Sequence, residues 1–144
     1  MAAISSMSGE CFFILKHCYF NSHDTISLLN EILTFHQHKE VVIFWDNATI
    51  HKSGEVKAFI EENPRLTTIC NLVHEPFNNG IESMWNYTKL LWKRRLTMEK
   101  LKLPVKFNSE AIVEDIMMKI GHSETFAFVR HGWKSILNDK RNPV

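Results

Sequence analysis

Two acidic residues stand where carboxylates can do chemistry. Asp46 directly follows the apolar run Val41–Trp45, and Glu82 falls in the first turn of a segment with helical periodicity. Functional sites in α/β proteins are built at the carboxyl ends of strands. Carboxylates on a strand end and on a facing helix can share hard divalent cations such as Mg²⁺, which prefers oxygen ligands. Because two such ions about 4 Å apart promote phosphoryl transfer, the acid pair predicts a site of that kind.

Each acid also has a purely structural interpretation. Asp46 can cap the turn that follows a strand, with help from Asn47. Glu82 can be an acidic residue that the helix dipole favours near a helix N-terminus. Asn47 and His51 can serve as hydrogen-bonding residues of the same loop. Residue type and position alone leave these alternatives open.

A basic surface is predicted on the helix that carries Glu82, where cationic side chains alternate with aromatic ones. Such a run is either a solvated helix face or a surface that contacts DNA phosphates. With two residues of the loop after Asp46, it gives the candidate DNA-binding residues His51, Lys52, Lys89, Lys93, Arg94 and Arg95.

Composition limits the class of protein. The chain has 144 residues with a formal net charge of +1, so we expect one domain, residues 1–144, whose DNA affinity comes from a local patch. Its 3 cysteines form no CxxC pair, which argues against a disulfide framework. The sequence contains neither a secretory signal pattern nor an apolar run long enough to cross a bilayer, so we expect no membrane association.

Hydrophobic patterning predicts strands alternating with helices in the first half of the chain. The expected elements are a strand over Glu10–Phe20 with a turn at Ser8–Gly9, a helix after Asn21–Asp24, a strand over Val41–Trp45, a helix from Ser53 to Asn63 and a strand over Leu66–Val73. The continuous apolar run Val41–Trp45 is typical of a central strand that is buried on both faces.

The second half is predicted to be helical after a loop from His74 to Gly80. The expected helices are Ile81–Leu96, a helix that Ser109 caps and that ends at Gly121, and a last helix that Ser123 caps, with Phe126, Val129, Trp133, Ile136 and Leu137 on its apolar face. This order of elements predicts an α/β fold with a helical C-terminal part.

Two segments resemble a known family. The run VVIFWDNATIHKS, Val41–Ser53, resembles the second-aspartate block of mariner-superfamily DDE transposases, in which a hydrophobic strand leads into Asp-Asn-Ala and then a His. The segment from His74 to Arg95 resembles their third block, in which Asn-Pro-Ile-Glu is followed by a Trp and a Lys. Those positions are Asn79, Gly80, Ile81, Glu82, Trp85 and Lys89, with Gly80 in place of the Pro.

The resemblance covers roughly residues 3–137 and implies an RNase H-like domain with a mixed sheet flanked by helices. It implies that Asp46 and Glu82 correspond to the second and third metal-binding acids, with Mg²⁺ as the cofactor of an active enzyme. Residues 3–20 are similar to the hairpin that follows the family's first-acid strand. We therefore expect an N-terminally truncated domain that lacks this strand and the helix-turn-helix domains of the family.

From this reasoning we expect a transposase-derived, domesticated and non-catalytic domain that binds no metal by default. It would act as an interaction or scaffold subunit of a nuclear, DNA-associated complex, for example a DNA-modifying one. A sheet that is one strand short leaves an open edge, through which another protein chain can pair. The alternative is a Mg²⁺-dependent transposase fragment that cleaves and transfers DNA strands when a missing segment or another chain completes it.

Overall fold

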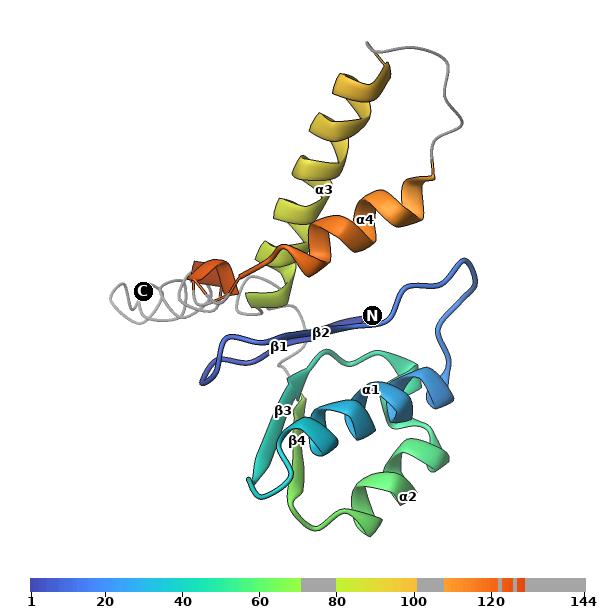
Figure 1. Cartoon of the computed structure of the whole chain (residues 1–144). Coiled ribbons are helices and arrows are strands. Elements are labelled where there is room, and N and C mark those ends of the chain that lie inside the picture. Colours follow the sequence, from blue (N-terminus) through green and yellow to red (C-terminus); the bar gives the residue numbers. More distant parts are fainter. Residues whose placement is uncertain (71–79, 101–107, 122, 126, 129–144) are drawn as a thin grey trace, which may run out of the picture. The chain divides into compact units, whose positions relative to one another are not determined.

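Figure 1 shows a computed structural model of the chain, which describes residues 1–70, 80–100, 108–121, 123–125 and 127–128. The elements in order are β1 (Ala2–Ile4), β2 (Cys11–Phe13), α1 (Ser22–Phe35), β3 (Val41–Trp45), η1 (Thr49–Lys52), α2 (Gly54–Glu62), β4 (Leu66–Cys70), α3 (Gly80–Lys100) and α4 (Ser109–Met118). The α/β class is therefore confirmed. Residues 1–2 and 12–76 form one compact unit, and residues 3–11 and 77–144 form a second.

Strands β1 and β2 form a two-stranded sheet. The turn predicted at Ser8–Gly9 is confirmed, since Gly9 has a φ of 78° and its N–H donates to the Ser5 carbonyl at 3.1 Å. A positive φ of this kind costs glycine little. The strand predicted to run to Phe20 ends at Phe13 instead. The following segment turns toward α1, where Lys16 forms an ion pair with Asp24.

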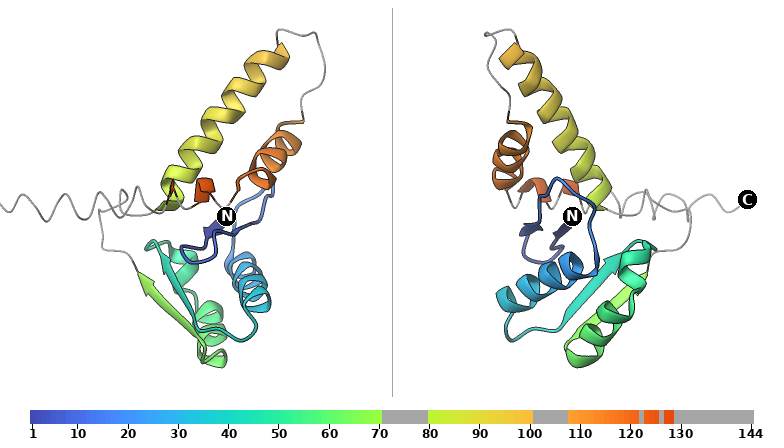
Figure 2. Two further views of the ribbon diagram at one scale, coloured as in Figure 1. Left: turned by 60° about the vertical axis from the view of Figure 1, so that its left-hand side comes forward. Right: turned by 90° about the vertical axis from the view of Figure 1, so that its right-hand side faces the viewer.

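The first unit contains a parallel pair of strands and two helices. Strand β3 pairs with β4 in the register that runs from Val41↔Leu66 to Trp45↔Cys70. Helices α1 and α2 lie on one side of this pair, as two further views show (Figure 2). Helix α1 begins at a capping box, in which the Asn21 side chain accepts from the Asp24 N–H and the Asp24 carboxylate accepts from the Asn21 N–H.

One prediction for β3 was wrong, because this strand is not buried on both faces. Val41 and Trp45 are buried, whereas Val42 and Phe44 are 50% and 63% exposed. The neighbouring strand continues this pattern, since Phe44 is paired with Ile69, which is 43% exposed. Side chains alternate between the two faces of a strand, and only one face of this pair meets α1 and α2. Among the described residues β3 pairs with β4 alone, so its other edge is open.

The second unit is built on α3 and α4. Met84 and Thr88 of α3 are buried, and so are Ile116 and Met117 of α4. The Thr88 hydroxyl lies 3.6 Å from the Met117 sulfur in this interface. Helix α4 ends at Met118, before the predicted Gly121. Its N-cap is Asn108, whose side chain accepts from the Ala111 N–H, and not the predicted Ser109.

Other predictions fall partly outside the described residues. Residues 71–79, which include most of the predicted loop before α3, lie outside them. So do Phe126, Val129, Trp133, Ile136 and Leu137 of the predicted last helix, although residues 123–125 and 127–128 are helical. Within the described part of the chain, no helix has the length and hydrophobicity needed to cross a membrane.

Candidate metal and DNA site

Asp46 projects from the carboxyl end of β3, and its side chain is 67% exposed. The buried Val41 and Trp45 anchor the strand, so the chain leaves the sheet at a fixed point. The Asp46 Oδ1 atom accepts a hydrogen bond from the Ala48 N–H at 3.0 Å. The turn-capping role proposed from the sequence is therefore present, and the carboxylate still faces solvent.

His51 returns toward Asp46 from the short helix η1. Its Nε2 atom lies 3.4 Å from Asp46 Oδ1. Its ring stacks on Trp45 with the centroids 4.5 Å apart and an interplanar angle of 8°. Burial lowers the pKa of His51, although the nearby Asp46 carboxylate acts in the opposite direction. A side chain predicted to bind DNA is thus mostly covered, with 13% of its surface exposed.

Glu82 and two candidate DNA-binding residues share one exposed face of α3. Glu82, Lys89 and Lys93 are all exposed. Lys89 and Lys93 follow Glu82 by seven and eleven residues, which correspond to about two and three helical turns. The three side chains therefore project in similar directions. The lysines lie about 10 and 16 Å along the helix axis from the acid at the usual helical rise. An acid that can hold a cation is therefore aligned with two charges that can hold phosphates.

The other basic residues of α3 have different surroundings. Arg95 forms an ion pair with Asp115 of α4, and Lys119 lies 2.9 Å from the same carboxylate. These contacts, that of Lys119 foremost, lower the pKa of Asp115. Arg95 thus joins two helices, which makes its guanidinium less available to bind a DNA phosphate. Lys52 of η1 is exposed.

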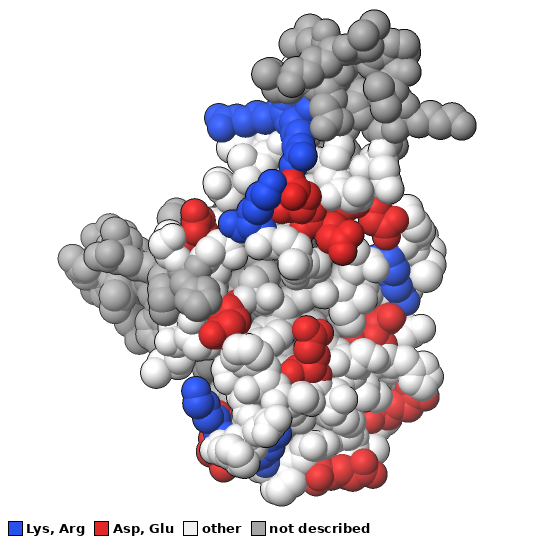
Figure 3. Space-filling model, in the orientation of Figure 1, with Lys and Arg blue, Asp and Glu red and all other residues white. Residues whose placement is uncertain are grey.

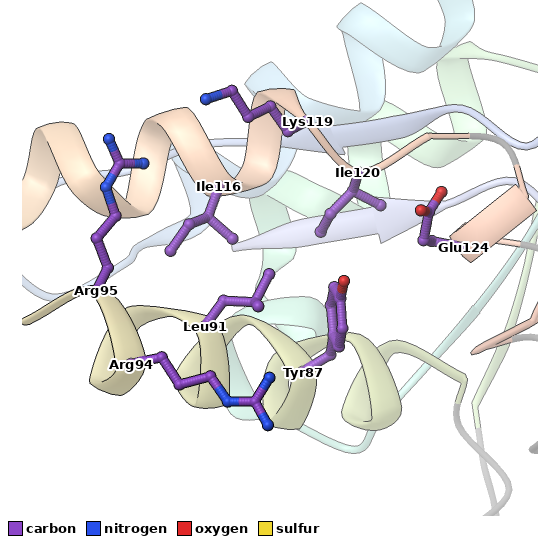
Figure 4. Close-up of a pocket in the computed structure, with 8 residues that line it drawn as sticks. All are labelled: Tyr87, Leu91, Arg94, Arg95, Ile116, Lys119, Ile120 and Glu124. Atoms are coloured by element: carbon purple, nitrogen blue, oxygen red, sulfur yellow. The ribbon is translucent and has the colours of Figure 1, made fainter. Parts of the chain in front are cut away.

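A cavity of about 400 Å³ lies between α3 and the region of α4 (Figure 4). Tyr87 and Leu91 of α3 face Ile116 and Ile120 across it, so its centre is apolar. Its remaining lining residues are charged, namely Arg94, Arg95, Lys119 and Glu124. Over the face of the molecule shown in Figure 3, acidic and basic side chains are interspersed, in keeping with a net charge of +1.

Comparison with known proteins decides the family. Residues 1–102, more than half of the chain, match the family described as DDE superfamily endonuclease. The chain belongs to this family. A protein of the insertion element IS630 from Shigella sonnei, described as an uncharacterized 39 kDa protein, is 36% identical over 61 residues. That match covers 42% of this chain and 18% of the relative, so the chain spans less than a fifth of the relative's length.

The side chains of this DDE endonuclease domain fit the chemistry of a magnesium site in part. Asp46 and Glu82 both offer exposed carboxylate oxygens, the ligands that Mg²⁺ prefers. They belong to different compact units, Asp46 to the first and Glu82 to the second. In the ranges that the structure describes, no three His, Cys, Asp or Glu side chains are grouped closely enough to hold a metal.

The sequence pointed to Asp46 and Glu82 through their positions at an element's end or start. It did not reveal the role of Trp45, which was predicted only as the last residue of a buried strand. An aromatic residue immediately before the acid, with a His five positions after it, is the signal that was available. This spacing brings the Trp and the His together only because η1 folds back onto the end of β3.

Proposed function

We propose that this chain is the DNA-handling part of a DDE-type transposase of mariner-like lineage. In this proposal Asp46 and Glu82 contribute carboxylates to a Mg²⁺ site, and Lys89 and Lys93 bind DNA phosphates. The observation that carries it is the shared exposed face of Glu82, Lys89 and Lys93 on α3. Support for the mariner-like lineage comes from the Asp-Asn-Ala run at Asp46 with its later His.

The proposed reaction is cleavage of a DNA phosphodiester. The oxygen of a water molecule forms a new bond to phosphorus, and the bond from phosphorus to the 3′ oxygen breaks. The products are a 3′ hydroxyl and a 5′ phosphate, and one proton is released. Bound Mg²⁺ would supply activation of the attacking oxygen and stabilisation of the leaving oxygen. Asp46 and Glu82 would hold the metal, and the two lysines would fix the strand beside it.

The proposal includes a third carboxylate from outside these two residues. Two carboxylates leave most of an octahedral shell to water, whereas a third ligand oxygen would tighten the site. The third group would come from a further acidic residue, of this chain or of another protein chain. This requirement makes metal and DNA binding the direct tests of the chain itself, independent of turnover.

The first test is Mn²⁺ binding followed by electron paramagnetic resonance on the full 144-residue chain. We expect Asp46→Ala and Glu82→Ala each to weaken binding at least tenfold. Glu61→Ala is the matched control, because Glu61 is an exposed acid on α2. Equal Mn²⁺ affinity of the native chain and Asp46→Ala would rule out the proposed metal site.

A second candidate function is the non-catalytic scaffold role in a nuclear complex. The open edge of β3 and the exposed Val42, Phe44 and Ile69 favour it, because an extended segment of another chain can pair there. Incubation with Mn²⁺ and nicked DNA separates the two candidates. Cleavage that Asp46→Ala abolishes would exclude the non-catalytic role. Absence of cleavage, with a protein partner that co-purifies with the native chain and is lost in Phe44→Lys, would favour it.

A further inference from the structure

The imidazole of His51 is held in place by an aromatic stack. Trp45 is the last residue of β3 and only 9% exposed, so its indole is fixed by the strand and the core. The His51 ring lies nearly parallel to that indole, at 4.5 Å between centroids. Offset stacking of this kind contributes about 0.5–1.5 kcal/mol beyond area burial. The ring is therefore oriented by its stack on an indole that the fold holds in place.

The oriented ring presents one nitrogen to the acid. Nε2 faces Asp46 Oδ1 at 3.4 Å, while the Ala48 N–H approaches the same oxygen at 3.0 Å. Nδ1 is buried and has no hydrogen-bond partner in the described part of the chain. Within the described residues the polar contact of the ring is thus at Nε2, which favours the tautomer with its proton on that nitrogen. Both of these contacts with Asp46 are made to Oδ1.

We propose that His51 is a positioning residue, which holds Asp46 Oδ1 through Nε2–H so that Oδ2 stays directed outward for a cation. The inference deepens the proposed function and rests on it. Trp45 is the second member of this device, because it sets the plane of the His51 ring. Side chains that hydrogen-bond a ligating carboxylate typically change metal affinity by about 10- to 100-fold when removed. The role assigned to His51 is therefore different from the DNA contact predicted from the sequence.

Three substitutions at His51 separate the ring from the N–H donor. His51→Gln keeps an N–H near the Nε2 position and loses the ring. His51→Met has a similar size and offers neither. His51→Phe keeps a ring that can stack on Trp45 and loses the donor. If His51 has only a structural role, the readouts of the three variants should follow the stability of each variant. If it has a positioning role, the readouts should depend on whether the variant keeps the N–H.

The decisive readout needs no metal. Scalar couplings of the Asp46 β-protons, measured by NMR on the full chain, report the side-chain rotamer. We expect one dominant Asp46 rotamer in the native chain and in His51→Gln, and averaged couplings in His51→Phe and His51→Met. The second readout is the Mn²⁺ dissociation constant. It should rise about tenfold in His51→Phe and His51→Met, and by less in His51→Gln.

The outcomes separate this inference from the proposed function. Unchanged Asp46 couplings in both His51→Phe and His51→Met would overturn the positioning role, whatever the metal affinity. A native chain that binds no Mn²⁺ would end the metal-site proposal, while the couplings still decide whether His51 orients Asp46. If His51→Phe fails to fold, the comparison of the size-matched Gln and Met variants decides alone.

Discussion

At the residue scale, Asp46 could be located from sequence because its setting is local. An apolar run that ends in an acid predicts a carboxylate at a strand end, and the structure places Asp46 there with 67% of its side chain exposed. The contact with His51 could not be predicted with the same reasoning. It depends on the path of η1 and on the stack with Trp45, and neither leaves a periodic pattern in the sequence.

Arg65 is a residue that sequence reasoning overlooked, and the structure gives it a specific role. Its guanidinium donates to the carbonyls of Leu33 at 2.6 Å, His36 at 2.5 Å and Lys39 at 3.3 Å. These groups lie at and beyond the end of α1, where helix carbonyls lack partners within the helix. A planar fork of donors can serve several carbonyls at once, which a lysine cannot do.

We predict that Arg65→Met lowers the free energy of unfolding by about 2 kcal/mol, since hydrogen bonds from a charged group each contribute about 1.5–3 kcal/mol. Urea unfolding followed by circular dichroism measures this loss as a lower midpoint. Arg65→Lys should recover less than half of it. Arg94→Met, at an exposed position of α3, is the control and should leave the midpoint unchanged. A native-like midpoint in Arg65→Met would show that these carbonyls do not need the guanidinium.

At the element scale, helices were predicted more accurately than strands. Helix α1 begins at Ser22, inside the predicted cap region, with Asn21 as its N-cap, and α2 follows Ser53, whose side chain accepts from the Val56 N–H. Both starts depend on side chains that lie within three residues, so local sequence is sufficient. The exposure of β3 was mispredicted because the covering of a strand depends on distant elements. An apolar run alone cannot show how many faces are covered.

The alignment of Lys89 and Lys93 on α3 leads to a prediction about DNA. The double substitution Lys89→Ala/Lys93→Ala should weaken binding to duplex DNA and reduce the slope of log affinity against log salt by about 2, one per lost phosphate contact. Fluorescence anisotropy across a series of salt concentrations measures both quantities. Lys57→Ala, at an exposed position on α2, should change neither.

Arg95→Ala provides a second comparison on the same helix. Because Arg95 pairs with Asp115, its loss should lower thermal stability and change the salt slope by less than the loss of either lysine. An exposed ion pair contributes at most about 1 kcal/mol, so the protein should remain folded. Equal salt slopes for Arg95→Ala and for Lys89→Ala would show that the face that contains Glu82 is not the preferred DNA surface.

At the scale of the whole molecule, the family and the α/β class follow from sequence, while the assembly of the site does not. Asp46 and Glu82 are in separate compact units, and a shared metal site needs a defined arrangement of both. Local patterns specify each unit through its own buried residues, such as Val56 in the first and Met84 in the second. No pattern within a unit specifies how two carboxylates from different units approach one cation.

Thermal unfolding with and without Mg²⁺ tests that arrangement directly. A ligand that binds only the folded protein stabilises it by RT ln(1 + [L]/Kd), which is about 1.4 kcal/mol at a ligand concentration ten times Kd. For a chain of this size the midpoint should rise by about 5 °C in MgCl₂ relative to EDTA at matched ionic strength. If one cation joins both units, Asp46→Asn and Glu82→Gln should each remove most of this rise. The double variant should then remove no more than either single one, because the two acids act on the same ion.

Glu61→Gln, the matched control on α2, should keep the full rise. Loss of the rise in Asp46→Asn together with a full rise in Glu82→Gln would show that Asp46 binds the cation without the second unit.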